Sequence, residues 1–133
     1  MSNYKILGLD DSKNKAVLFT PWSIIHFLFG YISMAYVNYF NINKDTGMII
    51  LFIIHVLYEA KDYFFSYVYK GSQFPLSKWS SDHSLYNCFG DNIVFILGMT
   101  FAINKNYSIS KLIIITILFL ILFYIFETNK DIN

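Results

Sequence analysis

Four long apolar segments follow one another along the chain, and short polar connectors separate them. The segments cover residues 22–40, 47–65, about 85–103 and 109–126. Each is close to the roughly 20 residues that a helix needs to cross about 30 Å of hydrocarbon. The pattern predicts an all-α polytopic membrane protein, an antiparallel bundle of four transmembrane helices. Residues 22–126 would form this transmembrane domain, between an N-terminal tail (1–21) and a C-terminal tail (127–133).

The residues around the segments predict where helices begin and how they connect. Thr20 suits the N-cap of the first helix, and Pro21 suits its first position, where the missing N–H is no loss. Asp82 is the candidate cap of the third helix. The connector at 66–81 is rich in aromatic residues, which favour the membrane–water interface. We therefore expect this connector to lie along the membrane surface.

Composition places the chain in the membrane class. Of its 133 residues, 56% are hydrophobic and only 14% are charged, whereas soluble domains carry about 25% charged residues. The net charge is +1 and basic clusters are missing, so we expect no nucleic-acid partner. Membrane lipid is the expected partner, and homo-oligomerisation is left open. Cys88 is the only cysteine, which excludes a disulfide within the chain.

The distribution of lysines predicts an orientation. With four spans, both tails and the connector at 66–81 lie on one side of the membrane. That side carries Lys5, Lys13, Lys15, Lys70, Lys78 and Lys130, and the other carries Lys44, Lys105 and Lys111. Because lysine is enriched on the cytoplasmic side, we expect a multi-pass protein with both termini in the cytoplasm.

A few polar residues interrupt the first three apolar segments, and helical periodicity puts them on single faces. Glu59 and Asp62 lie near the end of the second segment, and Asn87 and Asp91 near the start of the third. His26 lies one turn into the first. Since consecutive spans alternate in direction, all five belong at the cytoplasmic ends of the helices. Gly30 and Gly98 lie on the same faces as these polar residues and allow close helix packing.

This convergence predicts one buried polar site. Ionisable residues inside a membrane span are costly and usually functional. An imidazole with carboxylates and an amide can hold a divalent metal ion, so the candidate ligands are His26, Glu59, Asp62, Asn87 and Asp91. The candidate catalytic acid–base groups are His26, Glu59, Asp62 and Asp91. A hydrogen-bonded network that only pins the helices is the alternative, in which His55 simply bonds Glu59 and Asn92, beside Asp91, is a second member.

Three motifs in these segments resemble those of the VanZ-like group of small integral membrane proteins and its YjdF-type relatives. They are His26-Phe27-Leu28-Phe29-Gly30-Tyr31, Tyr58-Glu59-Ala60-Lys61-Asp62, and Asp82 to Asp91 leading into Gly98. The resemblance covers roughly residues 22–103 and implies a small helical membrane protein. That group is associated with resistance to glycopeptide antibiotics in some bacteria. Since this chain lacks arginine beside the acidic pair, we do not carry resistance over to it.

Three functions remain open from the sequence. The site could act on a lipid or lipid-linked substrate at the cytoplasmic headgroup level, with or without enzymatic turnover. The chain could instead be a cation or proton transporter or channel subunit, although only Ser33, Asn38 and Thr100 continue a polar path to the far side. A structural membrane component without activity is the third. Motifs of soluble hydrolases, nucleotide-binding loops and potassium filters are absent from the sequence.

Overall fold

The structure is a computed structural model, and it describes residues 4–9, 16–68 and 84–128, of which 65–68 by their backbone only. The described part is mostly helical, as predicted, and contains four helices. Two short strands, which the all-α prediction missed, precede them. The elements are β1 (Lys5–Leu7), β2 (Val17–Phe19), α1 (Trp22–Tyr39), α2 (Lys44–Val68), α3 (Leu85–Ala102) and α4 (Ile109–Thr128).

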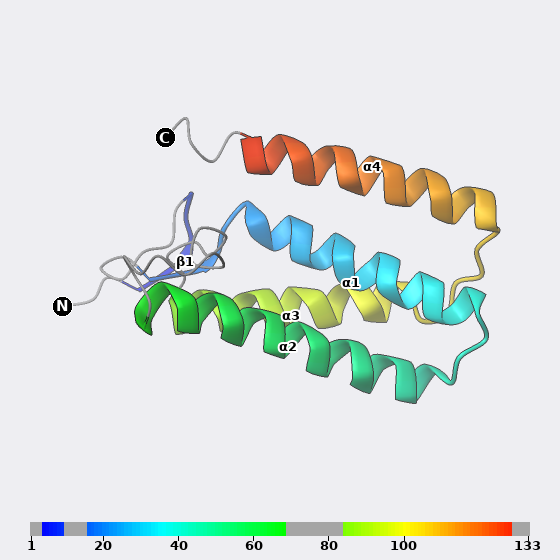
Figure 1. The fold of residues 1–133 in the computed structure, drawn as a ribbon, viewed down its shortest axis with the longest axis horizontal. Helices are drawn as coiled ribbons and strands as arrows, with labels where there is room; N and C mark the ends of the chain where they lie inside the picture. Colours follow the sequence, from blue (N-terminus) through cyan, green and yellow to red (C-terminus); the bar gives the residue numbers. More distant parts are fainter. Residues whose placement is uncertain (1–3, 10–15, 69–83, 129–133) are drawn as a thin grey trace.

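The helices run side by side along one axis, and α1 contacts each of the other three (Figure 1). Consecutive helices point in opposite directions, as the short connectors predicted. The start of α1, the end of α2, the start of α3 and the end of α4 therefore share one end of the bundle (Figure 1). β1 and β2 lie at this end and pair in parallel, with Lys5 opposite Val17 and Leu7 opposite Phe19. We call this end of the bundle, where α1 and α3 start and α2 and α4 end, the site end.

The closest helix pair is α1 with α3, and two glycines make the approach possible. A Cβ atom on Gly30 would overlap the backbone carbonyl oxygen of Phe95, and one on Gly98 would overlap that of Phe27. The predicted close packing along these faces is confirmed. Because backbone atoms fill the space, neither position can accept a side chain without moving the two helices apart.

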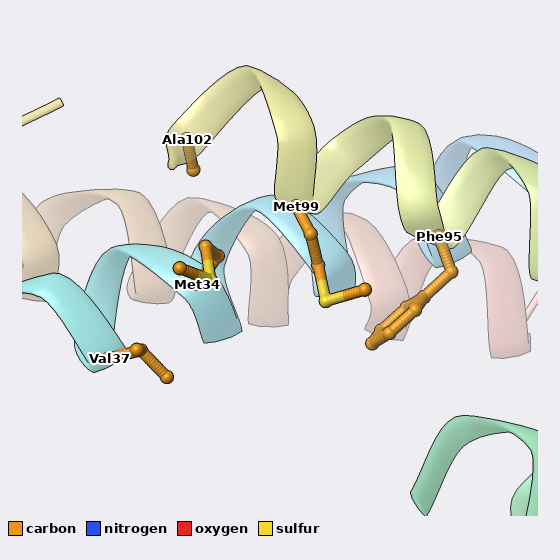
Figure 2. Packing of buried hydrophobic residues seen from close by; sticks show 5 residues of the cluster. All are labelled: Met34, Val37, Phe95, Met99 and Ala102. Carbon is orange, nitrogen blue, oxygen red and sulfur yellow. The ribbon is translucent and has the colours of Figure 1, made fainter. Parts of the chain in front are cut away.

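Beyond this contact, the half of the bundle away from the site end has an apolar core. Figure 2 shows its buried side chains from α1 and α3, which are Met34, Val37, Phe95, Met99 and Ala102. At the far end, the side-chain amide of Asn38 donates to the carbonyl oxygens of Ala102 (2.8 Å) and Ile103 (3.2 Å). This contact satisfies carbonyls that the end of α3 leaves without helical partners.

The helix starts differ from the prediction. Pro21 is the N-cap of α1 and no side chain caps it; instead the Thr20 backbone N–H donates to Ser23 Oγ (3.1 Å). Ser84 caps α3 by accepting from the Asn87 backbone N–H (3.1 Å). Asp82, the predicted cap, lies outside the described residues. The second helix, which the sequence allowed to end anywhere from 65 to 69, ends at Val68, and the rest of the expected surface connector lies outside the described residues.

Two helices, α3 and α4, are long and apolar enough to cross a membrane. The other two fall short of the same measure. In α2 the charged residues Glu59, Lys61 and Asp62 lie close together, and in α1 the polar side chains of His26 and Asn38 lower the mean hydropathy. Length and composition therefore support two of the four predicted spans.

The α1–α3 contact leads to a prediction about stability. Gly98→Ala places a methyl group against the Phe27 carbonyl, and such overpacking costs about 1–3 kcal/mol. We expect a lower unfolding temperature in detergent, measured by tryptophan fluorescence. Thr100→Ala, on the exposed side of the same helix, is the control. Equal unfolding temperatures for the two variants would contradict the tight contact.

Candidate functional site

At the site end, three side chains from α1 and α2 turn toward one another. His26 Nδ1 lies 2.9 Å from His55 Nε2 and 3.3 Å from Glu59 Oε1. His55 Nε2 lies 3.7 Å from the same Glu59 oxygen. His55 and Glu59 are one turn apart on α2 and almost fully buried, while His26 is partly buried. Their ligand atoms all lie within 4.8 Å of one another.

Two residues of α3 hold the ring of His55 in place. It stacks on the Phe95 ring with centroids 4.0 Å apart. Its Nδ1 lies 3.0 Å from Asn92 Oδ1, and the Asn92 amide nitrogen donates to the Cys88 carbonyl (2.7 Å). Because the amide nitrogen is committed to Cys88, the Asn92 oxygen faces the imidazole and accepts from Nδ1–H. The neutral ring then presents a lone pair at Nε2.

His26 is oriented in a similar way from α3. Its Nε2 lies 3.6 Å from Asp91 Oδ2, and Asp91 is completely buried. The Ser23 hydroxyl, one turn before His26 on α1, donates to Asp91 Oδ1 (2.6 Å). A proton on Nε2 would face this carboxylate, and a proton on Nδ1 would face His55 Nε2 and Glu59, so the neutral ring has an acceptor beside either nitrogen.

The tautomer of His26 decides what its Nδ1 offers to the group. In the Nδ1–H tautomer it donates to the lone pair of His55 Nε2. In the Nε2–H tautomer two imidazole lone pairs and a carboxylate oxygen face one another, an arrangement that a bound metal ion would stabilise.

The spacing fits a metal ion. Nitrogen and oxygen ligands about 2.1 Å from a tetrahedral ion lie about 3.4 Å from one another. The separations here are 2.9, 3.3 and 3.7 Å. The outer contacts to Asp91 and Asn92 are of the kind that orients metal-binding histidines. The group His26, His55 and Glu59 could therefore hold a metal ion.

The structure divides the five residues predicted for the site. His26 and Glu59 belong to the group, and Asp91 contacts it from behind His26. Asp62 is buried and forms an ion pair with Lys61 (2.5 Å). Asn87 is buried, and its amide donates to the Leu18 carbonyl beside β2 (3.3 Å). Asp62 is not a member of the group of His26, His55 and Glu59 that could hold a metal ion.

Three residues have a larger part in the site than the sequence indicated. His55 was considered only as a partner of Glu59, and Asn92 only as a second member of a network. Ser23 was not singled out. The signals were present in the spacing, since His55 is four residues before Glu59 and Ser23 is three residues before His26.

An apolar groove of about 350 Å³ reaches the two histidines between α2 and α4, with α1 as its floor. Its lining consists of Trp22, Ile25, His26, Phe29, Ile54, His55, Tyr58, Phe119, Leu120 and Phe123. The groove connects the group of His26, His55 and Glu59 to the outer surface of the bundle.

Comparisons with protein-family models, curated proteins and solved structures gave no match to this chain. The resemblance to the VanZ-like group stays a prediction, and the functional argument depends on the geometry of the site.

The contact between Ser23 and Asp91 leads to a second prediction. Ser23→Ala removes the hydroxyl donor from a buried carboxylate, and a hydrogen bond to a charged group is worth about 1.5–3 kcal/mol. We expect a corresponding loss of stability, measured by unfolding in detergent. Ser110→Ala, at an exposed position of α4, should leave stability unchanged. A Ser23→Ala protein as stable as this control would show that Asp91 does not depend on the hydroxyl.

Proposed function

We propose that this protein is a four-span membrane protein that binds one divalent transition metal ion of the zinc class at His26, His55 and Glu59. We further propose that it uses this ion to act on a lipid or lipid-linked substrate, with hydrolysis as the reaction class. The observation that carries the proposal is the mutual spacing of the three ligand atoms at 2.9, 3.3 and 3.7 Å.

The outer surface of the bundle supports embedding in a membrane. In α4, Leu112 is the one buried residue, and the exposed residues include Ile114, Leu118 and Tyr124. The outward side of α2 is similarly apolar. Exposing so large a contiguous apolar surface to water is energetically unfavourable, whereas contact with hydrocarbon is favourable. The same argument extends to α1, because α2, α3 and α4 surround it.

The ligand set supports hydrolysis. Two histidines and one glutamate form a ligand class of catalytic zinc sites, which keep a further position open for water or substrate. An ion held this way would lower the pKa of bound water to about 7 and would polarise a carbonyl or phosphoryl oxygen. Asn92 orients the ring of His55, Asp91 faces the ring of His26, and the groove that reaches both rings is apolar.

Transport has no observation in its favour among the described residues. The far half of the α1–α3 interface consists of the apolar cluster in Figure 2. Asn38 is committed to carbonyls at the end of α3, and the Thr100 hydroxyl donates to the Ile96 carbonyl of its own helix (2.8 Å). These contacts do not line a path through the bundle.

Metal binding is the direct test. Purified protein in detergent, dialysed against zinc, should retain about one ion per chain when measured by inductively coupled plasma mass spectrometry. His26→Ala, His55→Ala and Glu59→Gln should each weaken zinc affinity by at least about 100-fold, because each removes one ligand of three. Glu127→Gln, which removes an exposed carboxylate from α4, should retain zinc. Zinc retained by all three ligand variants would refute the site.

The orienting contact to His55 gives a graded prediction. Asn92→Ala leaves the three ligands in place but removes the acceptor of His55 Nδ1–H. Loss of such an outer contact typically weakens metal affinity about 10–100-fold. Competition with a fluorescent zinc chelator measures this difference. Asn104→Ala, exposed at the far end, should bind zinc as the unaltered protein does, and an equal affinity for Asn92→Ala would argue against the ring orientation described here.

A further inference from the structure

The groove between α2 and α4 has two chemically different parts. Eight of its ten lining residues are apolar or aromatic, and the other two are His26 and His55. Its surface is therefore hydrocarbon-like except where it meets the metal-binding group. Such a site fits a molecule with an apolar chain and one polar group, because the polar group would otherwise face a surface without partners.

The open side of the groove faces outward from the bundle. Its rim residues are half exposed, with Ile54 at 53%, Tyr58 at 47% and Leu120 at 56%. The neighbouring outer residues are also apolar and exposed, among them Ile50, Leu57 and Ile117. In a membrane an occupant would therefore enter sideways from the hydrocarbon, without crossing water.

Contacts on both sides of the groove keep α4 on α1. The Trp22 ring meets those of Phe123 and Phe126 edge to face, with centroids 6.0 and 5.5 Å apart. Farther along, the Tyr36 and Thr116 hydroxyls are hydrogen bonded at 3.0 Å. These contacts hold α4, one wall of the groove, against α1, which forms its floor.

We infer that this groove binds one acyl chain of a membrane glycerophospholipid and presents the adjacent ester to the metal-binding group. The inference rests on the proposed function and names its substrate class. A volume of about 350 Å³ is near the lower limit of ligand pockets, which fits one chain. The polar end of the occupant lies against the His26 and His55 rings, and the rest of the chain lies between Ile54 and Leu120.

The test is photolabelling in nanodiscs. The protein is reconstituted in phosphatidylcholine that carries a diazirine in one acyl chain, irradiated, digested and analysed by mass spectrometry. We expect adducts at groove residues of α2 and α4 to exceed those at Leu118 and Tyr124, which are exposed on α4 but do not line the groove. Uniform labelling along α4 would mean ordinary contact with bulk lipid and would overturn the inference.

A matched pair of variants makes the test specific. Leu120→Trp fills the groove from its rim and should reduce groove labelling at least fivefold. Leu118→Trp makes the same change two residues earlier, on the other side of α4, and should leave labelling unchanged. Ile54→Trp, on the opposite rim, repeats the test from α2. Labelling that neither groove variant reduces would overturn the inference.

Two further measurements separate the possible failures. Free fatty acid carrying the same diazirine is tested at the same mole fraction, and labelling from it alone would overturn the assignment to phospholipid. Zinc content is measured on the same samples. Groove-specific labelling of a protein that binds no zinc would refute the proposed metal function and support the groove. Zinc binding with uniform labelling would support the proposed metal function and overturn the inference about the groove.

Discussion

The contact on which the rest of this structure depends is the close approach of α1 to α3. Gly30 and Gly98 let the two backbones touch, with no room for a Cβ atom on either side. This approach brings Asp91 behind His26 and within hydrogen-bonding distance of Ser23. It also places Phe95 against the ring of His55, which reaches in from α2. The contact between α1 and α3 therefore determines both the packing of the helices and the arrangement of the side chains in the site.

Burying the polar group at the site end costs free energy, and hydrogen bonds from neighbouring side chains offset this cost only in part. Ser23 and Asn92 satisfy outer atoms of Asp91 and His55, so these side chains have fixed directions. The inner atoms, two imidazole nitrogens and one carboxylate oxygen, face one another instead. In the Nδ1–H tautomer of His26 the two rings pair as donor and acceptor, as a network that only holds helices together would also do. The feature that points to a metal ion is the mutual spacing of the three ligand atoms.

The surface of the bundle gives that group its context. An apolar groove links it to an outer face that is itself apolar, and the opposite half of the α1–α3 interface is closed by hydrophobic packing. The site is thus accessible from the side of the bundle and blocked along its axis. The proposed action on a lipid, in preference to passage of an ion, rests on this arrangement.

The sequence by itself determined the helices and the end of the bundle at which the polar residues lie. Runs of apolar residues of about 20 place α1 and α4 within a few residues of their observed bounds, because length and hydropathy are local properties. Alternating direction placed His26, Glu59 and Asp91 at one end. The strands β1 and β2 were missed, since three-residue strands leave no periodic signal.

Only the tertiary structure decided which side chains meet. The rotation of each helix depends on packing, and packing turned His55 inward to complete the group while Asp62 paired with Lys61 and Asn87 bonded the Leu18 carbonyl. Ser23 donates to Asp91 only because the backbones of α1 and α3 are in direct contact. Periodicity assigns a residue to a face of its own helix, but the partner of that face is set by contacts between residues far apart in the chain.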